Sequence, residues 1–101
     1  MAPQVEFHPL ASDEAVAGQE WYFEIRPDLA EAFEVELIRA IERVAASPGR
    51  WAPHLHGTRA FMLHRFPYFI VYRQMDDVVQ IVAVQHAKQK PGYWVSRIEA
   101  D

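Results

Sequence analysis

The stretch 59-RAFMLHRFPYFIVYRQMDDVVQIVAVQHAKQKPGYW-94 decides the fold of this chain. Its apolar residues recur with the period of two that is typical of strands, and the pair Asp76-Asp77 marks a turn between two of the apolar runs. We predict strands over Ala60–His64, Phe69–Arg73 and Val78–Val84. The last of these is apolar on both faces, which is typical of a central strand that is covered on at least one side by helices.

Two helical patterns precede this stretch. The first is predicted over Ser12–Ile25, with the Ser12 hydroxyl as its N-terminal cap. Pro27 opens the second, which ends at Ser47-Pro48-Gly49. The junction between the helices is so short that they should form an antiparallel hairpin. Residues at three- and four-residue spacing are expected to face the core: Ala11, Ala15, Gly18, Tyr22 and Ile25 in the first helix, and Leu29, Phe33, Leu37, Ile38, Ala40, Ile41 and Val44 in the second.

The remaining segments complete a β-α-α-β-β-β order. Val5–Phe7 resembles a short first strand, Arg50–Thr58 a loop, and the residues from Pro91 onward a single helical turn. A chain of 101 residues with one such pattern forms one domain, which here spans residues 1–101. The order predicts an α+β fold in which the helical hairpin packs on a twisted antiparallel sheet.

The charges are distributed unevenly along the chain. Residues 1–48 contain ten acidic and three basic residues, whereas residues 49–98 contain seven basic and two acidic residues. The net charge of the whole chain is −4. Such a split indicates either two surfaces with different tasks or helices that carry their acids on the solvent side.

Several classes of protein and site are not indicated. There is no cysteine, and the apolar runs are too short to span a membrane, so we expect a soluble, intracellular protein without disulfides. No glycine-rich phosphate loop is present, and we expect no cofactor. His54 and His56 could begin a metal site, but a stable site needs three or four ligands, and we expect no metal.

Five segments resemble, in order, those of the RelE/ParE superfamily of toxins from type II toxin–antitoxin modules. These segments are Val5–Ala11, Trp21–Ala30, Ser47–Trp51, Arg65–Tyr72 and Ala83–Trp94. The resemblance implies a small cytoplasmic bacterial toxin. It also implies a cognate antitoxin that wraps the toxin with a helix and an extended segment, in a toxin–antitoxin hetero-oligomer.

The resemblance leaves the target open between two kinds of partner. RelE-like members cut mRNA in the ribosome, ParE-like members act on DNA gyrase, and some members show little toxicity. The turn Phe66-Pro67-Tyr68 and the end Pro91–Trp94 resemble the ParE-like side. The chain is acidic, and its loop before the second strand holds His54, His56 and Arg59 but no lysine, whereas strong RelE-like nucleases are basic there. We therefore favour a gyrase-directed toxin, with an mRNA endonuclease or a binding-only member as alternatives.

Four residues are candidates for catalysis if the chain cleaves RNA. Such cleavage requires groups that move protons and cations that stabilise the phosphate. Arg65 and Lys88 could supply charge and His86 could exchange a proton, while Tyr93 resembles in position the tyrosine of RelE-like nucleases. Each also has a structural interpretation. Arg65 could brace its turn or pair with an acid of the hairpin, His86 could be hydrogen-bonded, and Tyr93 with Trp94 could clamp the chain end.

Overall fold

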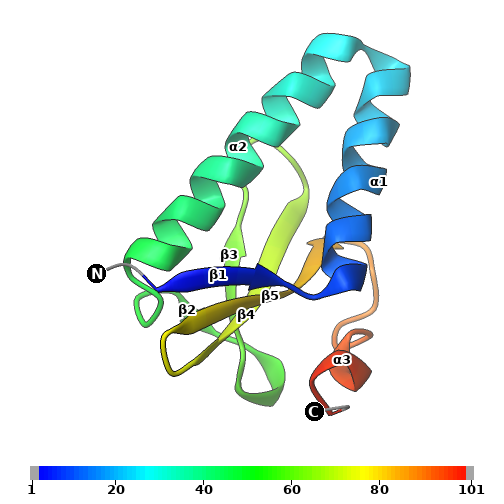
Figure 1. The fold of residues 1–101 in the computed structure, drawn as a ribbon. Helices are drawn as coiled ribbons and strands as arrows, with labels where there is room; N and C mark the ends of the chain where they lie inside the picture. The colour runs from blue at the N-terminus through cyan, green and yellow to red at the C-terminus, as the bar shows by residue number, and fades with distance from the viewer. Residues whose placement is uncertain (1–2, 100–101) are drawn as a thin grey trace.

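Two helices lie across one face of a five-stranded sheet in the computed structural model, which describes residues 3–99 (Figure 1). In chain order the elements are β1 (Gln4–Phe7), α1 (Pro9–Ile25), α2 (Pro27–Ala46), β2 (Ala52–Pro53), a 3₁₀ turn (Leu55–Gly57), β3 (Arg59–Met62), β4 (Tyr68–Met75), β5 (Val78–His86) and α3 (Val95–Glu99). The predicted α+β fold, the helical hairpin and the terminal helical turn are confirmed.

The sheet is mixed, so the prediction that it is antiparallel is wrong. Its strand order is β1-β5-β4-β3-β2, and β1 runs parallel to β5, with Gln4 opposite Val78 and Phe7 opposite Ile81. The other three pairs are antiparallel. The pattern of apolar residues tells which faces of a strand are buried, but it does not tell which distant strand lies alongside. The pairing of β1 with the last strand was therefore invisible in the sequence.

Strand β5 is buried on both faces, which confirms its prediction as a central strand. On one face, Val79, Ile81 and Val84 pack in a cluster that includes Phe33 and Leu37 of α2. On the other face, a second cluster joins β4 and β5 to the chain end; its buried members are Val71, Val82, Ala83 and Trp94. The segment after β5 therefore covers the face of the sheet that the hairpin leaves open.

Helix α1 begins earlier than predicted. Its cap is His8, whose Nδ1 accepts a hydrogen bond of 3.1 Å from the Leu10 amide, and Pro9 occupies the first turn. Ser12 lies inside the helix, so its prediction as the cap is wrong. A proline suits the first helical position because its missing N–H has no partner there in any helix.

Two of the residues expected in the core are exposed. Ile25 is 59% exposed and Ile38 is 50% exposed. Ile25 ends α1, at the connection of the hairpin that projects beyond the sheet (Figure 1). Ile38 lies beside Leu37, which takes the buried position at that turn of α2. Helical spacing alone overestimated the width of the buried stripe.

The segment predicted as a loop contains a short strand. In β2, Ala52 pairs with Ala60 and Pro53 with Arg59, which extends the sheet beyond β3 by two residues. The 3₁₀ turn follows, and both the amide and the hydroxyl of Thr58 donate to the carbonyl of Leu55. The free edge of β3 is therefore covered only at its first half.

Candidate functional site at the end of strand β5

Strand β1 covers only the first half of β5. Their pairing ends at Phe7 opposite Ile81, after which the chain turns into α1. Two side chains bond to the edge of β5 beyond that point. Glu14 of α1 accepts a 3.0 Å hydrogen bond from the Val84 amide, and Arg97 of α3 donates a 3.0 Å bond to the Val82 carbonyl. These side chains satisfy backbone groups that a continuing β1 would otherwise have paired.

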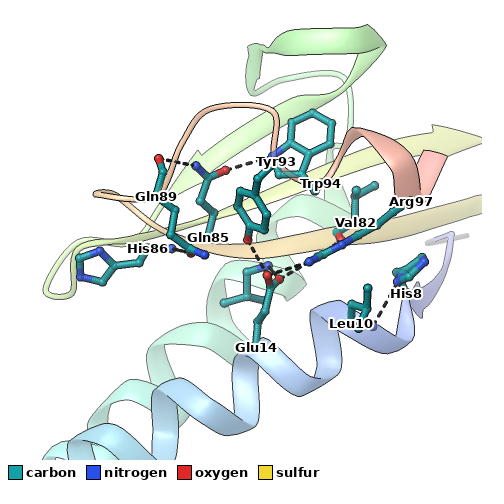
Figure 2. A network of polar contacts seen from close by, with 11 residues as sticks. His8, Leu10, Glu14, Val82, Gln85, His86, Gln89, Tyr93, Trp94 and Arg97 are labelled. Carbon is teal, nitrogen blue, oxygen red and sulfur yellow. Dashed lines mark hydrogen bonds and ion pairs between the residues drawn. The ribbon is translucent and has the colours of Figure 1, made fainter. Parts of the chain in front are cut away.

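Glu14 is the centre of a polar network that ties the chain end to α1 (Figure 2). Its carboxylate accepts two bonds of 2.9 Å from the Arg97 guanidinium and one of 2.5 Å from the Tyr93 hydroxyl. The side chains of Arg97 and Glu14 are only 9% and 19% exposed. A paired, charge-assisted geometry of this kind is among the strong polar contacts in proteins.

Tyr93 is held inside this network. Burial is the main reason that its pKa is raised, and the hydrogen bond to Glu14 and the charge of Glu14 raise it further. The guanidinium carbon of Arg97 lies 5.2 Å from the centre of the Tyr93 ring. The hydroxyl is therefore protonated at neutral pH and is already donated to Glu14. A catalytic role for Tyr93 stays a prediction.

Trp94 anchors the same segment from the other face of the sheet. It is fully buried, and its indole N–H donates a 3.0 Å hydrogen bond to the buried side chain of Gln85. The Gln85 amide group in turn donates to the Gln89 carbonyl at 3.3 Å. Tyr93 and Trp94 together hold the segment after β5 in place. This is the structural role that was considered for them from the sequence.

A tight turn between β5 and this anchor positions His86. The His86 amide donates to the Gln89 side chain at 2.8 Å, and the Lys88 amide donates to Nδ1 of His86 at 3.1 Å. Because Nδ1 accepts a hydrogen bond, a neutral His86 ring carries its proton on Nε2. The ring meets Tyr68 edge-on, with 5.0 Å between centroids. Lys88 and Lys90 are both exposed.

A cleft of about 400 Å³ opens between α1 and the ends of β4 and β5. We call it the α1–β5 cleft; it is lined by Glu14, Ala17, Gly18, Trp21, Tyr68, Val84, His86 and Gln89. Trp21 forms a large part of the wall and is 63% exposed. The cleft thus combines an open aromatic surface with polar groups that the turn after β5 holds in place.

Arg65 lies elsewhere, in the loop between β3 and β4. Its backbone amide donates to the Glu36 carboxylate of α2 at 3.1 and 3.2 Å, and the His64 amide donates to the same carboxylate. The guanidinium carbon of Arg65 lies 5.6 Å from the centre of the Phe66 ring. The expected contact with an acid of the hairpin is therefore present, but the main chain makes it.

A second depression, the α2–β3 groove, runs along α2. Its apolar floor includes Ala32, Val35, Phe61 and Met62, and Met62 is 59% exposed. Charged and polar side chains also line it: Asp28, Glu31, Glu36, Arg39, Arg43, His64 and Arg65. The four candidate residues therefore occupy two places. Arg65 lines this groove, whereas His86 lines the α1–β5 cleft with Lys88 beside it in the turn, and Tyr93 is bonded to Glu14, which lines the same cleft.

Three residues of the site were not predicted as functional. Glu14 was not named as a candidate, and Trp21 appeared only within a segment of the family resemblance. Arg97 was not singled out. Glu14 and Arg97 are 83 residues apart in the sequence, so no spacing could have paired them. The sequence signal for the cleft was Trp21 beside the charged residue Glu20. The structure shows that this tryptophan is exposed.

Two general properties follow from the described part of the chain. Across residues 3–99, no helix is both long and apolar enough to cross a membrane. Within the same residues, no three His, Cys, Asp or Glu side chains are grouped so that they could hold a metal ion. His54 lies instead against Phe69 and Trp94, with ring centroids 5.8 and 5.9 Å apart.

Comparison with known proteins gives one family. Residues 5–91 match the family described as the ParE toxin of the type II toxin–antitoxin system parDE. Toxin ParE2 of Mycobacterium tuberculosis is 25% identical over 92 residues, which cover 90% of this chain and 88% of that protein.

Solved structures show the same fold. The chromosomal ParDE toxin–antitoxin system of P. aeruginosa contains a chain that matches with a TM-score of 0.76 at 18% identity, covering 86% of this chain and 98% of that one. A free mutant of the E. coli toxin RelE matches with a TM-score of 0.56 at 22% identity, covering 99% and 93%.

Proposed function

This chain belongs to the ParE toxin family of type II toxin–antitoxin systems, and we propose that it arrests bacterial growth by acting on DNA gyrase. One observation carries the choice of gyrase over mRNA. The groups that RNA cleavage would need do not converge, since Arg65 lines the α2–β3 groove, whereas His86 lines the α1–β5 cleft and the Tyr93 hydroxyl is already bonded to Glu14. Proton transfer requires a group within hydrogen-bond reach of the reacting atom. This arrangement supports a toxin that binds its target rather than one that cleaves RNA.

The charge of the chain supports the same choice. A protein that binds RNA must neutralise several phosphates with lysine and arginine. The net charge here is −4, and the exposed acids Glu20 and Glu24 flank Trp21 on α1. The two lysines after β5, Lys88 and Lys90, are the only lysines in the sequence. With the arginines included, the chain has ten basic residues against fourteen acidic ones, so it is acidic as a whole.

We also propose that a cognate ParD-type antitoxin neutralises the toxin by occupying the α2–β3 groove. The lining residues of α2 run from Asp28 to Arg43, which is roughly 22 Å of helix, enough to lie along about four turns of a partner helix. Exposed apolar side chains such as Val35 and Met62 suit the helix-in-groove mode of binding. The edge of β3 beyond its pairing with β2 can accept an extended segment.

Inducing the chain alone in growing bacteria tests the proposed target. We expect growth arrest with double-strand breaks and an SOS response, while primer extension finds no new cleavage sites in transcripts. Co-expression of the cognate antitoxin should restore growth. New transcript ends within codons, with intact chromosomes, would instead identify an mRNA endonuclease.

Replacing Tyr93 by phenylalanine separates the two activities. The substitution removes one hydrogen bond to Glu14 but leaves the two from Arg97 and the one from the Val84 amide. We expect a loss of about 1 kcal/mol in the free energy of unfolding and unchanged growth arrest. Denaturant unfolding and the induction assay measure the two effects.

Tyr72→Phe provides the matched control for this variant. The Tyr72 hydroxyl donates a 2.5 Å bond to the Pro48 carbonyl, far along the chain from the Glu14 network, and Tyr72 is fully buried. Both phenylalanine variants should therefore lose similar stability and keep their toxicity. If transcripts are cut when the unaltered chain is induced, and only the folded variant at Tyr93 loses both this cleavage and toxicity, the tyrosine takes part in RNA cleavage and the proposal fails.

A further inference from the structure

We propose that the α1–β5 cleft receives an acidic segment of the toxin's target protein, whose carboxylate meets the His86 side of the cleft while an apolar side chain rests on Trp21. This inference rests on the proposed function, since it requires a toxin that works by binding a protein. The α2–β3 groove, which we assign to the antitoxin, is lined by none of the same residues.

The apolar part of the wall is unusually open. Trp21 is 63% exposed, and Ala17 and Val84 line the cleft with it. An exposed tryptophan beside small side chains can bury a large area when a partner side chain settles on it. Tryptophan is enriched among the residues that contribute most to protein–protein binding. This wall therefore suits an apolar side chain of the partner.

The polar part of the wall offers hydrogen-bond donors. Nδ1 of His86 already accepts the Lys88 amide, so Nε2 carries the proton and is the donor. The oxygen of Gln89 accepts the His86 amide, which leaves its NH₂ group as a donor. The Tyr68 hydroxyl reaches toward α1, at 3.4 Å from where a Cβ on Gly18 would lie. Three donors that line one cleft suit an acceptor, and a carboxylate offers four lone-pair sites.

Glu14, the acidic residue in the cleft wall, does not oppose the binding of a carboxylate. Glu14 accepts hydrogen bonds from the Val84 amide, the Tyr93 hydroxyl and both terminal nitrogens of Arg97. Its charge is compensated by Arg97 at 2.9 Å, and its oxygens are occupied. Lys88, exposed in the turn after β5, adds a positive charge beside the donors. Glu14 therefore brings no uncompensated charge to the part of the cleft where the donors lie.

A protein segment fits this cleft better than a nucleic acid. Both would bring negative groups, but a nucleic-acid backbone carries a charge at every nucleotide. Glu20 and Glu24 are exposed on α1 beside Trp21, so a continuous line of phosphates would run past like charges. One carboxylate followed by an apolar side chain avoids them. Opposite charges placed across an interface also steer the correct partner.

A titration followed by ¹H–¹⁵N NMR tests the cleft directly. The probe is a blocked hexapeptide with a single acid, Gly-Ser-Asp-Leu-Phe-Gly, and its matched control replaces that aspartate by asparagine. We expect shifts confined to the cleft, at Gly18, the Trp21 indole, Val84 and His86, with at least tenfold weaker binding of the control peptide. Equal binding of the two peptides, no binding, or shifts outside the cleft would overturn the inference. Tighter binding of a dodecamer of thymidylate at the same residues would overturn it in favour of a nucleic acid.

Two variants on α1 connect the cleft with the target. Trp21→Ala removes the cleft wall, whereas Phe23→Ala removes a similarly exposed aromatic side chain, 59% exposed, that does not line the cleft. We expect Trp21→Ala to weaken peptide binding at least tenfold and to abolish growth arrest, while the antitoxin still co-purifies. Phe23→Ala should keep all three properties.

The outcomes distinguish this inference from the proposed function. If Trp21→Ala loses the antitoxin or keeps full toxicity, the cleft does not receive the target and the inference fails. If the unaltered chain causes no growth arrest, the proposed function fails. The peptide titration then still decides whether the cleft takes an acidic segment.

Discussion

Replacing Phe33 by alanine is expected to lower the free energy of unfolding by about 3–5 kcal/mol. Phe33 is fully buried, and its ring lies 5.3 Å from that of Tyr22, 5.3 Å from that of Phe66 and 5.0 Å from that of Tyr68. These rings join both helices to the start of β4. The substitution removes buried area and leaves a cavity that the surrounding rings cannot close. For a small domain, such a loss is a large share of the total stability of about 5–15 kcal/mol.

Chemical denaturation of the purified protein measures this effect, and Phe23→Ala is its control. Phe23 is the same residue type on the neighbouring helix, but it is 59% exposed and should cost less than about 0.5 kcal/mol. Gly18 of α1 packs closely against the same ring, because a Cβ at this position would lie 3.0 Å from Phe33. Equal losses for the two phenylalanines would mean that the aromatic cluster does not hold the hairpin on the sheet.

Replacing Glu14 by alanine is expected to cost about 3 kcal/mol, because breaking a largely buried ion pair leaves the remaining charge without compensation. Arg97 is 9% exposed and would lose both of its bonds to the carboxylate. The Val84 amide and the Tyr93 hydroxyl would also lose their acceptor. The chain end should detach locally from α1 before the whole domain unfolds.

Amide hydrogen exchange measures that local effect. In Glu14→Ala we expect faster exchange at Val84 and across α3, with the rest of β5 less affected. Glu20→Ala, an exposed acid on the same helix, should change neither exchange nor stability. Removing Arg97 together with Glu14 should cost less than the sum of the two single losses, since the residues are in direct contact. Additive losses would mean that the pair is not coupled.

The elements of this fold were readable from the sequence because local patterns define them. The apolar runs of β4 and β5, bounded by turn residues, and the prolines around the helices are signals of this kind. The start of α1 could also have been predicted, since Pro9 indicates a first helical position more strongly than Ser12 indicates a cap. The parallel pairing of β1 with β5 could not be predicted, because no local pattern indicates which distant strands pair.

The site was less predictable than the fold for a related reason. The residues flagged by type, such as His86, do lie at the end of β5, where basic and aromatic residues gather in the sequence. The partners that decide their chemistry come from far away. Glu14 precedes Tyr93 by 79 residues, and only the completed fold brings them to 2.5 Å. Tyr93, which the sequence offered as a candidate for catalysis, thus donates its hydroxyl to Glu14 of α1.

Inhibition of purified DNA gyrase is the most direct test of a gyrase-directed toxin. The full-length chain is added to gyrase with relaxed plasmid and ATP, and negative supercoiling is followed by gel electrophoresis. We predict that supercoiling stops at a toxin excess, that cleaved plasmid accumulates, and that equimolar antitoxin restores the activity. Unimpaired supercoiling at the same excess, by a preparation that still arrests growth and cuts mRNA in a translating extract, would contradict the account.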